Sequence, residues 1–317
     1  MGETEGLLVS VITTAYNVGP YIEAAIRSVL AQTEADFELL VVDDGSTDDT
    51  VSRVEAVQDA RVKLFRGARR GAAGAANFGM SQARGEFVSF LDGDDLWTPR
   101  NLERHLAVMR EQPDCEMTFG LSRMVDEAGT DLGPTSRPAR VPLGEAELLV
   151  ENYCANGSAV MLRRSTVERV GEFRTDTGAC YDYDYWLRVA HGRGRNVRCV
   201  PEILVLYRRR NGQITSKWRT MSAGWSWVLQ RAQQRSPEMV EAVGPIGAMN
   251  MQRYFAYLAL EAGELRTAWQ LLWEGFGKAP GRFMVERRNY LVAGGLVAKA
   301  VLPGKLFETL ERQARRC

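Results

Sequence analysis

The first hundred residues alternate short apolar runs with helical patterns, and this alternation restricts the fold more than any other feature of the chain. Buried strands are predicted at residues 7–13, 37–42, 62–65 and 86–91. Apolar residues recur at helical spacing from Ile22 to Leu30, and a small-residue helix is predicted over 71–83. Strands that alternate with helices in this way form a mostly parallel sheet covered on both faces. We therefore predict an α/β fold.

Polar side chains follow three of these strands at the point where each ends. Residues 14–17 follow the first strand, Asp43 and Asp44 the second, and residues 92–95 the fourth. In open parallel sheets, ligands bind beyond the carboxyl ends of the strands. The sequence therefore predicts a binding site at one edge of the sheet.

The cluster after the fourth strand, Asp92-Gly93-Asp94-Asp95, crowds three carboxylates into four positions. Such carboxylates repel one another unless a hard divalent cation lies between them, and Mg²⁺ or Mn²⁺ commonly joins Asp side chains to substrate phosphates. We predict a metal-diphosphate site here. The alternative is a solvated acidic turn in which Asp95 caps the next helix. For Asp43 the alternative is that its carboxylate does no more than stabilise the turn in which it lies.

Bulk composition limits the class of protein. The 317 residues are 45% hydrophobic and 25% charged, as in an ordinary globular protein. Lys plus Arg equals Asp plus Glu at 40 each, so no overall field favours nucleic acid as a partner. Five cysteines without a Cys-x-x-Cys pair favour reduced thiols and a cytoplasmic location. No secretory signal is expected at the acidic N-terminus, and no apolar run reaches the ~20 residues of a membrane span.

Four blocks of the chain, in order, resemble glycosyltransferase family 2. They are residues 10–17 (SVITTAYN), 21–32, 41–48 (VVDDGSTD) and 85–95 (GEFVSFLDGDD). The similarity covers roughly residues 7–215. It implies the GT-A fold, an αβα sandwich, and inverting transfer from a nucleotide-diphosphate sugar with a divalent metal, Mn²⁺ or Mg²⁺.

The resemblance also assigns donor-site residues. Asp44 would contact the nucleotide base, and Thr14, Ala15 and Tyr16 would form the rest of that pocket. Asn77 matches the Asn of the family's helix, although Ala76 stands where Arg is usual. Close packing of small residues against the sheet is the alternative explanation for this helix.

The metal and the base follow from two further matches. Asp92 and Asp94 match the family's Asp-x-Asp motif, with Asp92 near the ribose and the metal and Asp94 as direct metal ligand. Residues 181–188 resemble the Glu-Asp-x-Asp motif and make Asp182 the catalytic base, although Tyr181 replaces the usual Glu. Asp184 is predicted to pair with Arg188 one helical turn later.

Residues 206–216 resemble the family's Tyr-Arg-x-His segment near the diphosphate, but Arg210 stands where His is common. A guanidinium does not ligate a metal, so Arg208 and Arg210 are expected to contact the diphosphate directly. The two histidines, His105 and His191, are expected to be ordinary surface or helix-end residues.

Beyond residue 217 the pattern becomes helical, which predicts a GT-A domain over 1–216 and a helical C-terminal region over 217–317. From Lys278 to the end there are nine Lys or Arg and three Glu, so 9 − 3 = +6. This charge suits peripheral contact with acidic lipid at the inner membrane face, or with a partner. A solvated helix pair is the alternative.

Together these features predict transfer of a single sugar from a nucleotide-diphosphate sugar to a hydroxyl acceptor on a glycan, a lipid-linked glycan or a protein. A sugar nucleotidyltransferase is the competing enzyme, but residues 13–17 lack the Gly-rich basic loop expected of one. A catalytically silent nucleotide-sugar-binding or assembly module is the competing hypothesis of a different class.

Overall fold

The computed structural model describes residues 7–134, 136–139, 141–210, 213, 215 and 217–302. The chain divides into two compact units, which are described separately. The first unit comprises residues 1–144, 153–175 and 184–209, and the second comprises 145–152, 176–183 and 210–317. The segments 145–152 and 176–183 thus group with the C-terminal helices, and the predicted single boundary at residue 216 stays a prediction.

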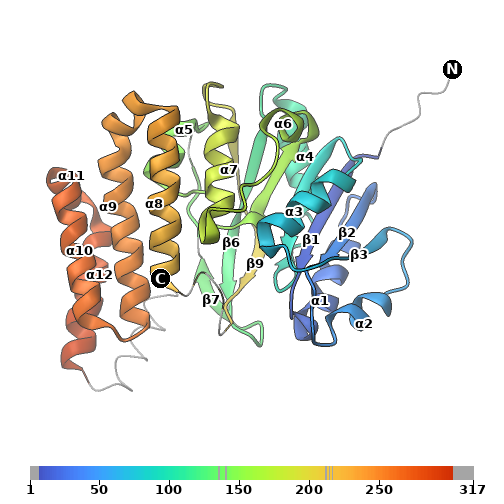
Figure 1. Ribbon diagram of the computed structural model, residues 1–317, viewed down its shortest axis with the longest axis horizontal. Helices are drawn as coiled ribbons and strands as arrows, with labels where there is room; N and C mark the ends of the chain where they lie inside the picture. The colour runs from blue at the N-terminus through green and yellow to red at the C-terminus, as the bar shows by residue number, and fades with distance from the viewer. Residues whose placement is uncertain are drawn as a thin grey trace. The chain divides into compact units, whose positions relative to one another are not determined.

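The first unit contains one nine-stranded sheet in the described part of the chain (Figure 1). Its strands are β1 (Val9–Ala15), β2 (Phe37–Asp43), β3 (Val62–Arg66), β4 (Phe87–Asp92), β5 (Leu96–Trp97), β6 (Met117–Val125), β7 (Asp131–Pro134), β8 (Val160–Arg163) and β9 (Val197–Arg208). The strand order is β3-β2-β1-β4-β8-β6-β9-β5, with β7 paired to β6. Strands β1 to β4 are parallel, whereas β8 is antiparallel to both β4 and β6. The predicted mostly parallel αβα sheet is confirmed.

Helices of the first unit precede or follow these strands along the chain. They are α1 (Gly19–Leu30), α2 (Thr50–Glu55), α3 (Gly71–Gln82), α4 (Asn101–Glu111), the 3₁₀ turn η1 (Gly157–Ala159), α6 (Arg164–Val170) and most of α7 (Tyr181–Ala190). Pro20 lies in the first turn of α1, a position that proline's fixed φ suits.

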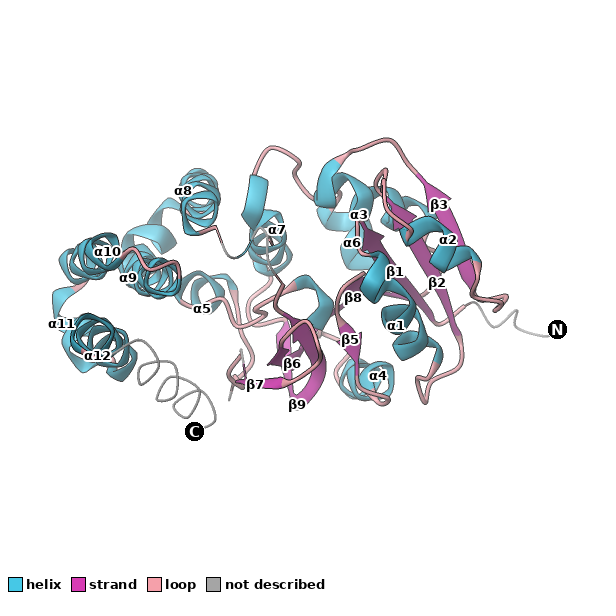
Figure 2. Cartoon of the chain, turned by 90° about the horizontal axis from the view of Figure 1, so that it is seen from below, coloured by secondary structure: helices cyan, strands magenta, loops and turns pink. Residues whose placement is uncertain are grey.

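The two faces of the sheet pack against different helices (Figure 2). Alternate side chains such as Val11 and Leu39 share a buried cluster with Ile26 of α1 and Leu106 of α4. On the opposite face α3 approaches β1, where a Cβ at Gly79 would lie only 2.4 Å from Cγ2 of Ile12. The small residues of α3 therefore do permit close packing of helix on sheet.

Ser46 lies before α2, which begins at Thr50, and its hydroxyl accepts a hydrogen bond from the Asn17 backbone amide at 2.9 Å.

One local expectation was wrong. His105 is neither a surface nor a helix-end residue. Its side chain is fully buried under α4, where Nδ1 lies 2.8 Å from Oγ1 of Thr118 and burial lowers its pKa to about 3.

The second unit is helical. It contains α5 (Glu145–Val150), η2 (Gly178–Cys180), the start of α7, α8 (Trp218–Arg235), α9 (Pro237–Glu261), α10 (Leu265–Lys278), α11 (Pro280–Val285) and α12 (Arg287–Val301). Gly263, at φ +79°, separates α9 from α10, and α10 ends at Lys278 before Pro280. A search of the described residues finds no helix with the length and apolarity that crossing a bilayer requires.

Segment 145–152 is built into this helical unit by hydrogen bonds and close packing. The Asn250 amide donates to the carbonyl of Val150 at 2.7 Å, and Arg235 forms an ion pair with Glu145 at 2.8 Å. Gly247 of α9 leaves no room for a side chain, because its Cβ would lie 2.4 Å from the Leu149 carbonyl oxygen.

Candidate active site

Three polar strand ends of the first unit meet at one edge of the sheet, as predicted. β1 lies between β2 and β4 and is parallel to both, with Ala15 opposite Asp43 and Thr14 opposite Asp92. The Thr14 hydroxyl donates to a carboxylate oxygen of Asp92 at 3.3 Å, and the Asp44 amide donates to the Ala15 carbonyl at 2.8 Å. The edge therefore joins three separate segments, two through side chains and the third through the backbone.

Asp44 joins this edge to helix α3. One carboxylate oxygen accepts from the Arg70 amide at 2.6 Å and the other from the Gly71 amide at 2.9 Å. These are donors that a helix N-terminus leaves without intrahelical partners, and the helix dipole favours a negative charge there. Beside them, the Arg69 guanidinium lies 4.4 Å above the centre of the Tyr16 ring. Tyr16, Asp44 and the start of α3 thus form one connected surface.

The neighbouring Asp43 has a purely local function. Its carboxylate accepts from the amides of Gly45 at 3.1 Å and Ser46 at 3.2 Å. Gly45 has φ +83°, a conformation that side-chain-bearing residues rarely adopt. The structure thus supports the turn-bracing alternative for this carboxylate.

Asp95 is buried inside the protein, and its hydrogen bonds stabilise the acidic turn. It is fully buried, accepts from the Ser158 hydroxyl at 2.6 Å and from the Arg208 amide at 2.9 Å, and does not cap α4, which begins at Asn101. Burial, followed by the negative charges of Asp94 and Asp92, raises the pKa of Asp95 well above its usual value. The turn therefore concentrates negative charge at the end of β4.

Sequence reasoning missed the part that Ser158 plays in this turn. Its hydroxyl accepts from the Asp92 amide at 3.0 Å while donating to Asp95, and its carbonyl accepts from the Trp97 indole at 2.8 Å. The segment Asn156-Gly157-Ser158 reads as an ordinary polar loop and gives no local sign of these bonds. A serine whose bonding partners lie 61 to 66 residues earlier in the chain cannot be distinguished from a loop serine without the fold.

The residues at this edge fit a divalent cation in their chemistry. Asp92 and Asp94 offer carboxylate oxygens, the ligands that Mg²⁺ and Mn²⁺ prefer, and their charges already raise the pKa of a neighbouring carboxyl. In the described part of the chain no group of three or more His, Cys, Asp or Glu is arranged to hold a metal ion. Mg²⁺ is commonly bound by one or two carboxylates, with substrate phosphates and water completing its ligands.

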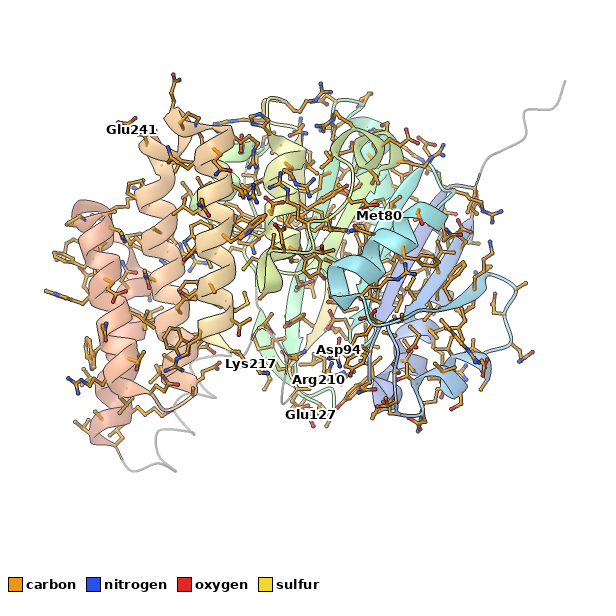
Figure 3. The ribbon with its side chains drawn as sticks, in the orientation of Figure 1. Met80, Asp94, Glu127, Arg210, Lys217 and Glu241 are labelled. Carbon is orange, nitrogen blue, oxygen red and sulfur yellow. The ribbon has the colours of Figure 1, made fainter. Side chains whose placement is uncertain are left out.

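Arg208, at the end of β9, binds main-chain carbonyls around the acidic turn. Its Nε donates to the Asp94 carbonyl at 2.8 Å, and its Nη1 donates to the carbonyls of Asp126 at 3.1 Å and Glu127 at 2.9 Å. Figure 3 labels Asp94 and Glu127, the two ends of this bridge. The guanidinium also lies 5.0 Å from the centre of the Tyr21 ring and the residue is only 6% exposed. Arg208 thus stabilises the turn that bears Asp94.

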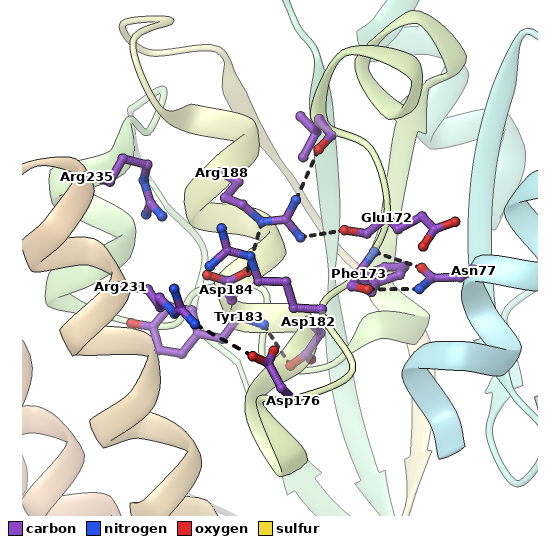
Figure 4. Close-up of polar contacts among 12 residues, drawn as sticks. Asn77, Glu172, Phe173, Asp176, Asp182, Tyr183, Asp184, Arg188, Arg231 and Arg235 are labelled. Atoms are coloured by element: carbon purple, nitrogen blue, oxygen red, sulfur yellow. Dashed lines mark hydrogen bonds and ion pairs between the residues drawn. The ribbon is translucent and has the colours of Figure 1, made fainter. Parts of the chain in front are cut away.

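Asn77 also bonds to the main chain. Its amide nitrogen donates to the Phe173 carbonyl at 2.8 Å, and its oxygen accepts from the Phe173 amide at 2.7 Å (Figure 4). The Phe173 ring in turn lies 5.4 Å from the ring of Phe90 and 4.2 Å from that of Tyr185. Asn77 therefore fastens the loop after α6 to α3.

Asp184 forms the predicted ion pair. Its carboxylate is buried and accepts from Nε of Arg188 at 2.8 Å, with Nε of Arg174 at 3.9 Å. Arg188 also donates to the carbonyls of Val170 and Glu172 (Figure 4). Asp184 is thus a structural ion-pair partner within the first unit.

Asp182 and Arg210 belong to the second unit. Asp182 lies in the first turn of α7, and one of its carboxylate oxygens accepts from the Tyr183 amide at 2.8 Å. Burial raises the pKa of Asp182 to about 6. The Arg210 amide donates to Oε1 of Gln213 at 3.3 Å.

The sheet, its strand order and its covering helices form a GT-A fold. The structure resembles the mannosyltransferase PcManGT of Pyrobaculum calidifontis, solved with GDP-Man and Mn²⁺ (TM-score 0.62, 22% identity, 97% of this chain and 84% of that one). It also resembles Staphylococcus aureus TarS 1-349, solved with UDP-GlcNAc (TM-score 0.58, 18% identity, 87% and 82%). These likenesses confirm the GT-A fold.

The chain belongs to glycosyl transferase family 2, whose family model matches residues 10–171. It is 31% identical over 224 residues to the putative teichuronic acid biosynthesis glycosyltransferase TuaG of Bacillus subtilis, covering 69% of this chain and 86% of TuaG. It is 46% identical over 103 residues to the Escherichia coli UDP-Glc:alpha-D-GlcNAc-diphosphoundecaprenol beta-1,3-glucosyltransferase WfgD. That match covers 32% of this chain and 41% of WfgD, so the chain spans about two fifths of the length of this relative.

Proposed function

We propose that the protein is a metal-dependent inverting glycosyltransferase that moves a single sugar from a nucleotide-diphosphate sugar to a hydroxyl acceptor. The observation that carries this proposal is the meeting of Thr14, Asp44, Asp92 and Asp94 at one sheet edge. The family and the activities for which its relatives are named support the same reaction class.

Donor recognition is assigned to the surface formed by the ends of β1 and β2 and the start of α3. Asp44 takes the nucleotide base, with Thr14, Ala15 and Tyr16 completing the pocket. Asp44 already accepts two amide hydrogen bonds, which fix the carboxylate before a ligand arrives. Asn77 contributes by holding α3 in place through its two bonds to Phe173.

Asp94 and Asp92 would hold the divalent metal, Mn²⁺ or Mg²⁺, with Asp92 also near the ribose. A bound cation there neutralises diphosphate charge and favours its departure. Arg208 keeps the turn in position through the Asp94 carbonyl, and Arg210 is assigned to the diphosphate, which suits a guanidinium.

Asp182 is assigned as the catalytic base. Inverting transfer needs a group that accepts the acceptor hydroxyl's proton as that oxygen attacks the sugar. A carboxylate with a pKa of about 6 is ionised at neutral pH yet more basic than an ordinary Asp, and both properties suit proton transfer.

The acceptor is proposed to be a hydroxyl of a surface polysaccharide, a lipid-linked glycan or a protein glycan, reached from the cytoplasm. WfgD and WfaP of Escherichia coli, two relatives, are named for diphosphoundecaprenol-linked sugars, and TuaG for teichuronic acid. These names favour a lipid-linked or polymeric acceptor.

The test is a thermal-shift screen of nucleotide-diphosphate sugars with and without Mn²⁺, followed by donor hydrolysis. A ligand that binds only the folded protein raises its melting temperature. We expect a shift that needs Mn²⁺ and is lost in Asp94→Asn but kept in Asp36→Asn, which alters an exposed carboxylate of the same unit. If the wild type binds donor but never turns it over, it is a silent binding module. If no donor shifts it, the donor-site assignment is wrong.

A further inference from the structure

The exposed large apolar side chains of the described residues gather in three helices of the second unit. Eight of the nine lie in α10, α11 and α12, and the other is Val141. They are Trp269, Trp273, Met284, Val285, Tyr290, Leu291, Val297 and Val301. Within the described residues, the exposed large apolar side chains are thus concentrated in three consecutive helices.

On α12 these side chains follow helical spacing. Tyr290, Gly294, Val297 and Val301 recur every three or four residues on one exposed stripe, with Leu291 beside Tyr290 at 63% exposure. Leu296, on the inner side of the helix, is fully buried. A helix that packs apolar residues inward and also exposes an apolar stripe has a second surface to cover.

The three helices share this surface, which we name the α10–α12 face. Trp273 of α10, 72% exposed, stacks on Phe276 at 5.0 Å, and Phe276 meets Phe283 of α11 edge-on at 5.5 Å. The Tyr290 hydroxyl of α12 donates to the Met284 carbonyl of α11 at 2.7 Å. Ring contacts and a hydrogen bond therefore connect the exposed groups from helix to helix.

The charge of these helices indicates what covers the face. Residues 265–302 contain six Lys or Arg and two Glu, so 6 − 2 = +4, in a chain of net charge zero. Lys278, Arg282 and Arg287 are exposed, whereas Glu286 accepts hydrogen bonds from Arg288. A second copy of the chain would bring another +4 surface against this one. An anionic surface would meet opposite charge instead.

We propose that the α10–α12 face binds the anionic surface of a lipid bilayer. Trp273, Met284 and Leu291 enter the interfacial region, where aromatic and aliphatic side chains are favoured, while Arg282 and Arg287 meet acidic headgroups. The proposal deepens the proposed function in one respect, because it makes a lipid-linked acceptor the fitting class of acceptor.

The test is flotation of the full chain with two kinds of vesicle, one of phosphatidylcholine alone and one that also contains phosphatidylglycerol. We expect binding to the second kind that weakens as salt is added. Replacing Arg282 and Arg287 together by Gln should weaken it about 25-fold, since each cation near an anionic surface contributes about fivefold. Trp273→Ser with Leu291→Ser should weaken it by about tenfold or more.

Val141→Ser is the matched control, because Val141 is 51% exposed and lies outside the face. Circular dichroism would verify that each variant is folded. The proposal is overturned if the wild type does not float with anionic vesicles, or if the Trp273 and Leu291 variants float as well as Val141→Ser. It is also overturned if those variants instead dissolve a dimer seen by sedimentation, which would assign the face to a second copy.

Flotation and donor binding are separate measurements. A wild type that shifts with donor and Mn²⁺ but ignores vesicles would leave the proposed function standing and remove the membrane surface. A wild type that floats with vesicles but binds no donor would remove the proposed function and leave the membrane surface standing.

Discussion

Replacing Asp182 by Asn should make the protein more stable at neutral pH while removing its transfer activity. Burial raises the pKa of Asp182 to about 6 from an ordinary value of 3.8, so the folded state holds this proton more tightly than the unfolded state does. Above the folded pKa both states are ionised, and the folded state alone bears the cost of a buried charge. That cost is absent below about pH 4, where both states are protonated.

The magnitude follows from the shift. About two pKa units at 1.36 kcal/mol each give a cost of about 3 kcal/mol at about pH 8. At about pH 5, integrating the pH dependence of stability with the same two pKa values gives a cost of about 1.6 kcal/mol. The stability gained by Asp182→Asn should therefore nearly double between these pH values.

The assay is urea unfolding of the wild type and Asp182→Asn at both pH values, with donor turnover measured alongside. Loss of a general base should lower turnover by about 10²- to 10⁴-fold, and wild-type turnover should rise as pH increases through about 6. Asp176→Asn is the control, because Asp176 is an exposed partner of Arg231 in the same unit (Figure 4) and should change stability by less than about 0.5 kcal/mol. An Asn variant no more stable than the wild type at the higher pH, or equally stabilised at both, would refute the reasoning.

Two further predictions concern packing and charge in the first unit. Gly79→Ala should cost about 1–3 kcal/mol by overpacking, because the new Cβ would lie 2.4 Å from Cγ2 of Ile12. Gly277→Ala, on an open helical site, should be neutral or stabilising by up to about 1 kcal/mol, and equal effects of the two in urea melts would contradict the packing argument. Asp184→Ala should lower the free energy of unfolding by about 3–5 kcal/mol, because it leaves the charge of Arg188 uncompensated in a largely buried site. A loss of stability under about 1 kcal/mol would show that the ion pair is dispensable.

The fold of the first hundred residues could be predicted because its signals are local. Each strand is a short apolar run, each helix has its own period, and Pro20 fixes the start of α1. Parallel strands then require the clusters after β1, β2 and β4 to share an edge, so their meeting followed from the order of elements alone.

The later strands could not be ordered in this way. β8 lies between β4 and β6 and runs antiparallel to both, while β6 is parallel to β9, which lies far along the chain. Such pairings depend on contacts between distant segments, which no local pattern encodes. The burial of His105 was missed for the same reason, since its partner Thr118 lies on a strand rather than on its own helix.

Individual side-chain roles were also beyond local patterns. The sequence indicates that Asp92, Asp94 and Asp95 are close together in the chain. It does not indicate that Asp95 faces inward to Ser158, or that burial and the charges of its neighbours raise its pKa. Nor does a motif distinguish Asp43, which braces a turn, from Asp44, which holds the start of α3.

The hydrogen bonds of Asn77 and Arg208 have a consequence for how motif matches are transferred between proteins. Both positions match a pattern associated with ligands, yet these two side chains donate four hydrogen bonds to main-chain carbonyls elsewhere in the same chain. A residue retained because it keeps a loop shaped leaves the same trace in an alignment as one retained because it touches a sugar nucleotide. The hydrogen bonds that a side chain already makes within the protein are therefore a better guide to its role than its match to a family motif.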